Sequence, residues 1–447
     1  MLGHAGAIID AAHRKSRSCR TYHDPRTSVS HLGIQPHSRV GVLNNQGVPP
    51  APDLTSSEAL ADPFPIYHQL REHDPVHWSE RATAWVVTRY DDIVRCLKDP
   101  RMSAARAGAM FARMPVEVQE ATRPLQHAFA HWMLMMDAPD HTRLRALVAK
   151  AFAPTLVARL RPRVEALVDQ ALARFEHTGT TELIGDLAHP VPALVIAELL
   201  GLEDADPRQI HAWADDLALM ERGPAAFHLA QASMLGMMEY IRTIADARRA
   251  RPREDLISSL LAAEEQGQVL DEDELLYTCV MLLFAGHETT KNLIGNGILE
   301  LLRHPDQLAL VRDDRTLVEP AIEELLRFHG SIQRVRRTVT EPFELGGKQL
   351  RAGDSVWLVV GAANRDPSVF PDPDRMDVHR RPTRHLTFGF GPHFCVGATL
   401  ARLEGAIAID AIVQRLHDLR GPTAPLVWRE DLSFRGVRAL PLEFTPR

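Results

Sequence analysis

The feature that most constrains the fold is an uninterrupted helical segment in the second half of the chain. Asp271, with Glu274 three residues on, forms an aspartate-led helix-starting box, and no proline follows until Pro305. One helix can therefore run about 30 residues, or about 45 Å, which is long enough to cross a whole domain. Its middle, residues 279–286, is apolar on nearly every side. We therefore expect this helix to be buried on all faces.

A polar run interrupts this apolar helix at residues 285–290, with the sequence AGHETT. Glycine and threonine weaken a helix, and a buried carboxylate is costly without partners, so such a run is expected only at a functional site. A hydroxyl of Thr289 that bonds the carbonyl one turn back, beside Gly286, can open the helix locally and leave room for small molecules. Taken alone, the run more often marks a solvated Glu288 and a core threonine.

A second unusual segment, residues 388–397, places Cys395 in a glycine-built loop that opens onto a helix. Gly391 and Gly397 are predicted to let the backbone turn sharply and approach a bulky planar partner. The segment Ala398 to Leu416 has apolar residues at helical spacing, so its positive end is expected to favour the ionised sulfur. A thiolate with amides directed at it suits a metal. The alternative is a buried structural cysteine at a helix start.

This loop resembles the haem-binding signature of the cytochrome P-450 family. Phe388 is followed by glycine three residues on, Cys395 seven on and a second glycine nine on, which matches every fixed position. The resemblance implies that Cys395 is the axial thiolate ligand of haem b, where it favours cleavage of the O–O bond. It also implies that the cofactor contacts Phe388, Gly389, His393 and Gly397, with His393 beside a propionate.

The run at residues 285–290 is similar to the oxygen-activation segment of the same family. By that resemblance Ala285 and Gly286 lie against the cofactor, Thr289 hydrogen-bonds the bound dioxygen, and Glu288 helps to relay protons to it. The order of this segment and its spacing to Cys395 favour this interpretation over a core threonine.

Three further motifs carry roles that only the resemblance implies. Glu324 and Arg327 alone would predict a modest surface pair, but in the family this pair folds onto an arginine at the position of Arg380 and stabilises the core. His141 and Arg145 lie four apart on one helix face that starts after Pro139. They match the family's propionate-binding pair, and Arg337 matches a further propionate contact, with a register made ambiguous by Arg334 and Arg336.

The resemblance implies a mainly α fold with a small β region, in one large haem-binding domain with a long central helix. We place this domain at residues 51–447 and expect strands near residues 84–88 and 355–360. Residues 1–50 fall outside the resemblance and are predicted to be a disordered N-terminal extension, or the product of an upstream start codon. An organelle-targeting peptide is the alternative.

Composition limits the classes of function. The net charge is -7 without a basic block, which argues against a nucleic-acid partner. No apolar stretch approaches the 18 or so residues that span a bilayer. The four cysteines show no disulfide framework, which favours the cytoplasm. The chain ends about fifty residues after Cys395, too few for a fused reductase, so electrons from NAD(P)H are expected through ferredoxin and ferredoxin reductase, or flavodoxin.

We therefore predict a bacterial-type soluble haem-thiolate monooxygenase that uses O2 to hydroxylate or epoxidise a hydrophobic small molecule, as in secondary metabolism. A peroxygenase is an alternative, but the family's peroxygenases lack the acid–threonine pair. An isomerase or dehydratase would have an identical haem loop, and a haem-binding sensor would leave Glu288 and Thr289 unexplained. A large apolar ligand is suggested, against ordinary core packing, by Met110, Met114, Met220, Met234, Met237 and Met238.

Overall fold

This computed structural model describes residues 54, 56–112, 114–152, 154–202, 207–218, 224–263, 267–381, 384–429 and 433–446. The chain divides into two units, Met1–Ala51 and Pro52–Arg447. The predicted disorder of residues 1–50 and the predicted ligand contact at Met220 lie outside the described residues.

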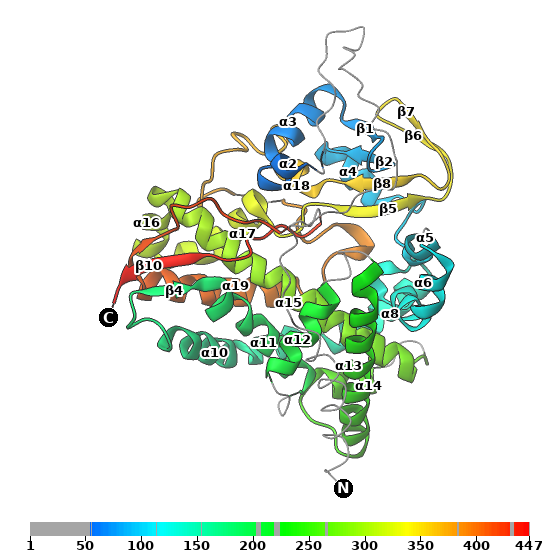
Figure 1. The fold of residues 1–447 in the computed structure, drawn as a ribbon, viewed down its shortest axis with the longest axis horizontal. Coiled ribbons are helices and arrows are strands. Elements are labelled where there is room, and N and C mark those ends of the chain that lie inside the picture. Colours follow the sequence, from blue (N-terminus) through cyan, green and yellow to red (C-terminus); the bar gives the residue numbers. More distant parts are fainter. Residues whose placement is uncertain are drawn as a thin grey trace, which may run out of the picture. The chain divides into compact units, whose positions relative to one another are not determined.

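Helices make up most of the second unit (Figure 1). The α-helices are α2 (Ser57–Ala61), α3 (Phe64–His73), α4 (Tyr90–Lys98), α5 (Ala107–Ala112), α6 (Val116–Ala121), α7 (Arg123–Ala130), α8 (Asp140–Ala151), α9 (Pro154–Arg159), α10 (Arg161–Ala173), α11 (Pro190–Leu200), α12 (Pro207–Ala218), α13 (Pro224–Ala250), α14 (Leu256–Ala262), α15 (Glu272–Arg303), α16 (Pro305–Asp313), α17 (Val318–His329), α18 (Val360–Ala363) and α19 (Ala398–Arg415). Short 3₁₀ segments are η1 (Met133–Met135), η4 (Arg315–Leu317) and η5 (Gly391–His393), and η2 (Ile184–Ala188) is a π-helix.

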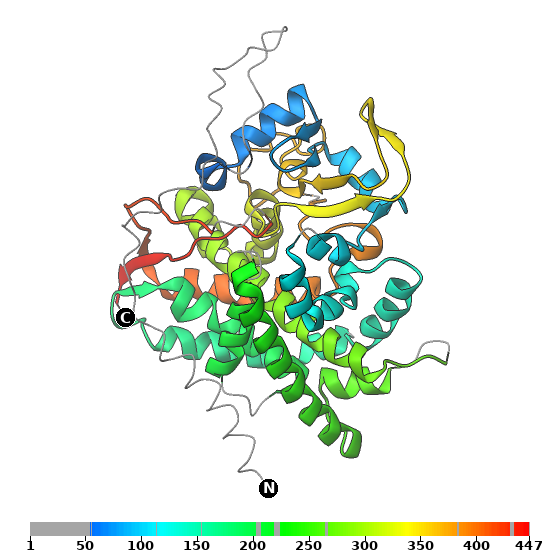
Figure 2. The same cartoon turned by 45° about the vertical axis from the view of Figure 1, so that its right-hand side comes forward.

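The strands form three small sheets. They are β1 (Val76–Ser79), β2 (Ala84–Val87), β3 (Met102–Ser103), β4 (Thr180–Glu182), β5 (Val335–Val339), β6 (Phe343–Leu345), β7 (Lys348–Leu350), β8 (Ser355–Leu358), β9 (His417–Arg420) and β10 (Pro441–Thr445). The largest sheet has the order β1-β2-β8-β5-β3, with β2 and β8 parallel and the other neighbours antiparallel. In Figures 1 and 2 this sheet lies at one end of the unit and the long helices at the other.

The predicted long helix is confirmed as α15. The Asp271 side chain accepts a hydrogen bond from the Glu274 N–H, and the Glu274 side chain accepts one from the Asp271 N–H, so both halves of the capping box are present. The helix then continues without a break to Arg303. The sequence therefore predicted both its start and its length.

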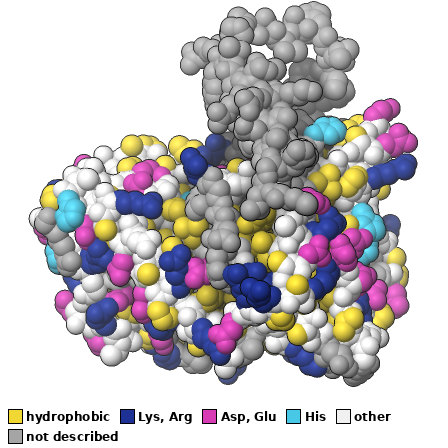
Figure 3. Space-filling view, turned by 90° about the horizontal axis from the view of Figure 1, so that it is seen from below, with side chains coloured by type: hydrophobic (Ala, Val, Ile, Leu, Met, Phe, Trp, Pro, Cys, Tyr) yellow, Lys and Arg dark blue, Asp and Glu magenta, His cyan; other side chains and the backbone are white. Residues whose placement is uncertain are grey.

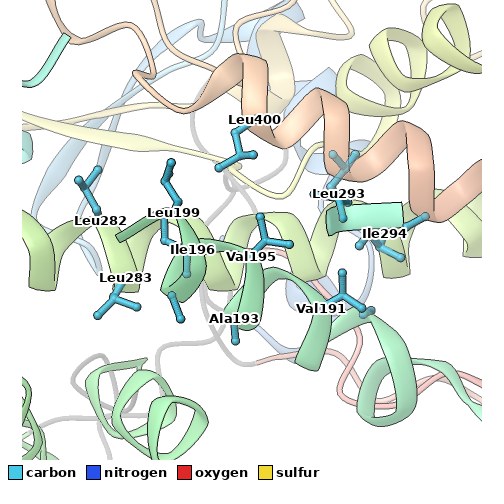
Figure 4. Close-up of a cluster of buried hydrophobic side chains, with 14 of the residues drawn as sticks. Val191, Ala193, Val195, Ile196, Leu199, Leu282, Leu283, Leu293, Ile294 and Leu400 are labelled. Carbon is cyan, nitrogen blue, oxygen red and sulfur yellow. The ribbon is translucent and has the colours of Figure 1, made fainter. Parts of the chain in front are cut away.

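Helix α15 is buried because other helices pack around it. Helix α11 is apolar on almost every side, and α11, α17 and α19 all contact α15. Figure 4 shows where they meet, with Ile196 and Leu199 of α11 and Leu400 of α19 close to the apolar side chains of α15. Burial of such side chains stabilises the fold by roughly 1.5–3 kcal/mol for each one. The core thus fixes α15 relative to the segment that begins α19.

Figure 3 shows the charged side chains on one face of the molecule. On the face drawn in Figure 3, side chains of Lys and Arg are interspersed with those of Asp and Glu. Among the described residues, we find no helix that combines the length and apolar character needed to cross a bilayer.

Candidate active site

The loop before α19 places Cys395 next to the start of that helix. Two glycines make its turns, since Gly389 has φ of 74° and Gly391 has φ of 70°, in the left-handed region that strains other residues. A Cβ atom on Gly391 would also lie only 3.2 Å from the Leu97 carbonyl oxygen. The Cys395 N–H donates to the Phe388 carbonyl oxygen at 2.8 Å and closes the loop.

Gly397 lies in the turn that leads into α19, as predicted, but it does not need the conformational freedom of glycine there. Its φ is -86°, which any residue can adopt. A Cβ atom at this position would lie 4.0 Å from Cys395 Sγ, an ordinary van der Waals distance. The two positive φ angles of the loop belong to Gly389 and Gly391, since residue type alone does not reveal which glycine of a loop adopts one.

The pKa of the Cys395 thiol depends on its burial, on a backbone N–H and on two arginines. Burial raises the pKa of the thiol, while a hydrogen bond from the Gly397 N–H and the charges of Arg145 and Arg402 lower it, and the net shift is upward. The N–H at the helix start therefore favours the thiolate, as predicted, but burial of the thiol outweighs it. The residue is nonetheless accessible to solvent, so it can bind a metal ion, whose charge would deprotonate it.

Cationic and imidazole side chains from three elements gather beside this loop. His141 and Arg145 come from α8, Arg337 from β5 and His393 from η5. The ring centroids of His141 and His393 are 3.9 Å apart. Burial, together with the neighbouring charges of His141 and Arg337, lowers the pKa of His393 to about 3. Burial and the charge of Arg145 likewise lower the pKa of His141. Such a cluster favours an anionic ligand.

One face of α15 is open where the sequence predicted a site. Ala285, Gly286 and Thr289 are partly exposed, whereas the residues between them are buried. Because residues three and four apart share a helix face, these three form a single surface. The Thr289 hydroxyl donates to the Ala285 carbonyl oxygen at 2.8 Å, which confirms the predicted hydrogen bond one turn back.

The helix does not open at this point, however. Helix α15 is continuous from Glu272 to Arg303, so the predicted local opening beside Gly286 is wrong. A Cβ atom on Gly286 would lie 3.3 Å from two side-chain carbons of Ile196 in α11. Glycine thus allows α11 to approach closely at this point, and a larger residue would require the Ile196 side chain to move by a few tenths of an ångström.

Glu288 lies beside Thr289 in the sequence but is buried among polar partners. Its carboxylate accepts a hydrogen bond from Lys291 Nζ at 2.7 Å and from Asn292 Nδ2 at 3.1 Å. Arg429 Nη1 lies 3.1 Å from the carboxylate. The contact of Arg429 could not be predicted from the sequence, because this residue follows α19, more than 130 residues after Glu288. Lys291 and Asn292, three and four residues on, could have been found from helical spacing.

The predicted cluster of Glu324, Arg327 and Arg380 is present. Arg327 donates from Nε and Nη2 to the two carboxylate oxygens of Glu324, each at 2.7 Å, and both side chains are fully buried. Arg380 Nε adds a hydrogen bond to Glu324 at 3.2 Å. Arg327 also donates to backbone carbonyls of Asn364 and Pro373. These contacts tie α17 to the segment that leads into the Cys395 loop.

Comparison with known proteins identifies the family of this chain. The family model described as Cytochrome P450 matches residues 224–418. Cytochrome P450 monooxygenase PikC of Streptomyces venezuelae is 41% identical over 412 residues, which cover 89% of this chain and 95% of PikC. This chain belongs to the cytochrome P-450 family. The predicted family, fold class and activity are thus confirmed, and the chain is a haem-thiolate monooxygenase, an oxidoreductase that uses haem and O2.

Two further proteins similar to this chain are also cytochrome P450 proteins. Polyketide biosynthesis cytochrome P450 PksS of Bacillus subtilis (strain 168) is 36% identical over 393 residues, which cover 86% of this chain and 96% of PksS. Among solved structures, P450BioI in complex with hexadec-9Z-enoic acid ligated acyl carrier protein has a TM-score of 0.80 and 35% identity. That match covers 87% of this chain and 99% of the solved chain.

The residues of this cytochrome P-450 fit a haem group. Cys395 supplies a single thiolate donor, as haem-thiolate ligation requires. His141 Nε2 is buried without a hydrogen-bond partner among the described residues, and an acidic edge of the cofactor would satisfy it. The buried guanidinium of Arg337 adds a charge that a propionate would compensate. The donor set therefore matches both the metal and the two acidic groups of haem.

The methionines that suggested a ligand pocket mostly pack in the core. Met234, Met237 and Met238 of α13 are buried in the main hydrophobic cluster, and Met110 and Met114 pack against that cluster, partly buried. This is the ordinary core packing that the sequence left open as the alternative.

Proposed function

We propose that this monooxygenase takes two electrons from NAD(P)H through a ferredoxin and ferredoxin reductase, or a flavodoxin. With them it inserts one oxygen atom of O2 into a large hydrophobic small molecule. The domain that does so is proposed to span residues 51–447. The predicted cytoplasmic location stays a prediction.

The observation that carries the proposal is the open face of α15 formed by Ala285, Gly286 and Thr289. Most of the middle of α15 is buried, but these three residues are partly exposed, and one of them, Thr289, carries a hydroxyl. When bound, haem supplies the activation of O2 and the oxidising power for C–H bonds. The Thr289 hydroxyl, fixed by its bond to the Ala285 carbonyl, can hold a water molecule that delivers a proton into the site.

The remaining predicted residues are proposed to bind the haem or to stabilise the core around it. We propose that Cys395 ligates the iron and that His141, Arg145, Arg337 and His393 hold the propionates, which supports a fixed position for the cofactor. Phe388, Gly389 and Gly397 would shape the loop beneath it. Glu324, Arg327 and Arg380 hold the core without touching the reacting atoms.

The relatives support an apolar substrate of considerable size. PksS is described as a polyketide-biosynthesis enzyme, and the P450BioI structure contains a hexadec-9Z-enoic acid on a carrier protein. The hexadec-9Z-enoic acid of the second protein is a long hydrocarbon chain. We therefore propose that this chain oxidises a polyketide-like or long-chain molecule of secondary metabolism.

Reconstitution with isotopically labelled oxygen tests this proposal. The purified enzyme would be mixed with a surrogate ferredoxin, its reductase, NADH and candidate substrates chosen by the shift of the haem Soret band. We expect one atom from ¹⁸O2 in each product molecule and no product without the partner proteins. Product formed from hydrogen peroxide alone would indicate a peroxygenase, and a product without added oxygen would indicate an isomerase or dehydratase.

A further inference from the structure

Two histidines at the end of α7 form a pair that the proposed function does not use. His127 lies in the last turn of the helix, and His131 is the residue at which the helix ends. Residues four apart share a helix face, and histidines at this spacing on a helix can bind one zinc ion together. The two ring centroids are 4.2 Å apart, with an angle of 35° between the ring planes. His127 is exposed and His131 is partly exposed, so both can be reached from solvent.

The hydrogen bonds of the pair leave nitrogen lone pairs for a metal ion. His131 Nδ1 lies 2.7 Å from the His127 carbonyl oxygen. Because a carbonyl oxygen can only accept, Nδ1 carries the proton of the neutral ring, and Nε2 keeps its lone pair. Metal-binding histidines commonly use the second nitrogen in this way to fix the orientation of the ring. Among the described residues, the His127 ring contacts the rings of His131 and Tyr277 and makes no hydrogen bond.

The separation of the two rings suits a single ion. Zinc binds histidine nitrogens at about 2.0–2.1 Å, so two nitrogens on one tetrahedral ion lie roughly 3.3 Å apart. Rings with centroids 4.2 Å apart can meet this requirement when the His127 side chain alone rotates. The hydrogen bond that orients His131 is then kept.

Nearby negative charge favours a cation at this position. The carboxyl end of a helix carries partial negative charge, and both histidines lie at that end of α7. The Tyr277 ring is 5.7 Å from that of His127 and 5.6 Å from that of His131. Burial raises the pKa of Tyr277, and the carboxylates of Asp273 and Asp271 at the start of α15 raise it as well. These carboxylates therefore act on the neighbourhood of the histidine pair.

One cationic side chain opposes this effect. Arg123 precedes His127 by four residues on α7, so it lies on the same helix face. Its side chain is 76% exposed and lies 3.8 Å from the Glu120 carboxylate. Solvent screening and this partner weaken its repulsion of an ion. Arg123 and His127 also line a cavity of about 590 Å³ between α5 and α7, which gives an ion access to the His127 ring.

We propose that His127 and His131 bind one divalent transition-metal ion of the zinc, cobalt, nickel or copper group. Imidazole is a ligand that these ions prefer, whereas Mg²⁺ and Ca²⁺ prefer oxygen ligands. Among the described residues, histidines, cysteines and carboxylates form no group of three or more that could hold a metal ion, so water fills the remaining positions. The site uses none of the residues proposed to bind haem, and it therefore goes beyond the proposed function.

Fluorine nuclear magnetic resonance of the holoenzyme tests this site. The protein is labelled with fluorotyrosine and studied in the diamagnetic ferrous carbonyl form, and Tyr277→Phe identifies the signal of Tyr277 among those of the five tyrosines, Tyr22, Tyr67, Tyr90, Tyr240 and Tyr277. We expect paramagnetic Co²⁺ to shift the Tyr277 signal until the site is saturated. An excess of Zn²⁺ should reverse the shift, because Zn²⁺ competes for imidazole, and an equal excess of Mg²⁺ should not.

Variants of the two histidines locate the ion. His127→Gln and His131→Asn should each weaken Co²⁺ binding at least about tenfold, because the second imidazole binds the ion intramolecularly. His73→Gln is the matched control, since His73 is exposed in the last turn of α3, and it should leave the Tyr277 response unchanged. The carbon monoxide difference spectrum of each variant shows whether its haem site is intact. If one histidine variant loses haem, the other decides.

A Tyr277 signal that does not respond to Co²⁺ would overturn the proposal. A Co²⁺ response that persists unchanged in the histidine variants would also overturn it, because the ion would then bind elsewhere. No substrate, redox partner or turnover enters the experiment, so its outcome is independent of the proposed function.

Discussion

At the scale of single residues, the surroundings of Cys395 favour its thiolate form only in part. The Gly397 N–H and two arginines favour the thiolate, but burial outweighs them and keeps the pKa of the thiol raised. The metal charge supplies what the protein does not. The sequence predicted the residue and its neighbours, while the balance between burial and hydrogen bonding required the structure.

Replacement of Cys395 by serine tests its assignment as the iron ligand. In Cys395→Ser, a neutral hydroxyl replaces a sulfur that iron would ionise, and a hydroxyl is a far weaker donor. We expect the carbon monoxide difference spectrum to lose its thiolate band and haem content to fall. Cys96→Ser, at a buried cysteine outside the site, is the control and should keep the band. A thiolate band in Cys395→Ser would disprove the ligand assignment.

The Arg327 cluster predicts a large effect on stability. Arg327→Ala would leave the fully buried carboxylate of Glu324 without its main partner, which typically costs about 3–5 kcal/mol. We expect low haem retention and a reduced free energy of unfolding in urea. Arg161→Ala removes an exposed pair with Glu165 and should cost less than about 1 kcal/mol. Equal stability of the two variants would contradict a structural role for Arg327.

At the scale of elements, individual helices could be predicted from local sequence, whereas contacts between distant segments could not. Helix α15 could be predicted from its capping box and apolar middle, and α19 begins at Ala398 as expected, ending one residue earlier at Arg415. Helices α9 and α10 follow one another closely, with Leu160 between them. Local pattern fixes such elements, whereas the pairing of β5 with β8 and the contact of Arg429 with α15 join segments distant in the sequence.

The contact between α17 and α19 predicts an acid dependence of stability. Arg402 of α19 donates to Glu323 of α17 at 2.6 and 3.0 Å, and His385 Nε2 lies 3.4 Å away. Burial by itself would raise the pKa of Glu323, but His385 and Arg402 outweigh burial and hold the pKa at about 2, below the ordinary 4.5. The stabilisation is therefore complete above about pH 4.5 and is lost as the pH falls towards 2.

Glu323→Gln tests this window. We expect the variant to unfold in urea with a free energy lower by roughly 2 kcal/mol at pH 7, and the difference from wild type to shrink at pH 3. Glu319→Gln, on the same helix at an exposed position, should show no such pH dependence. A difference that stays constant from pH 7 to pH 3 would show that Glu323 acts through packing rather than through its charge.

At the scale of the whole molecule, the core brings together segments that carry separate parts of the chemistry. The open face of α15, the Cys395 loop and the cationic groups of α8 and β5 come from four regions of the sequence. Their residue types and spacing could be identified from the sequence. Their mutual burial, the continuity of α15 at Gly286 and the partners of Glu288 depend on tertiary packing, which no local pattern encodes.

Thr289 is proposed to direct protons during oxygen activation, and the coupling of product formation to NADH consumption in Thr289→Ala tests this role. We expect haem binding and substrate affinity to remain near wild type, because the hydroxyl is bonded only to the Ala285 carbonyl among the described contacts. Loss of one positioned proton donor typically slows the step it serves about 10²- to 10⁴-fold. Thr290→Ala, at the neighbouring buried threonine, is the matched control.

The measurement is the ratio of product to NADH consumed, taken together with hydrogen peroxide, for wild type and both variants with the same substrate. The account predicts that Thr289→Ala still consumes NADH and O2 but releases peroxide in place of product, while Thr290→Ala remains coupled. An unchanged product ratio in Thr289→Ala would contradict the claim and would leave Thr289 as a residue of the core.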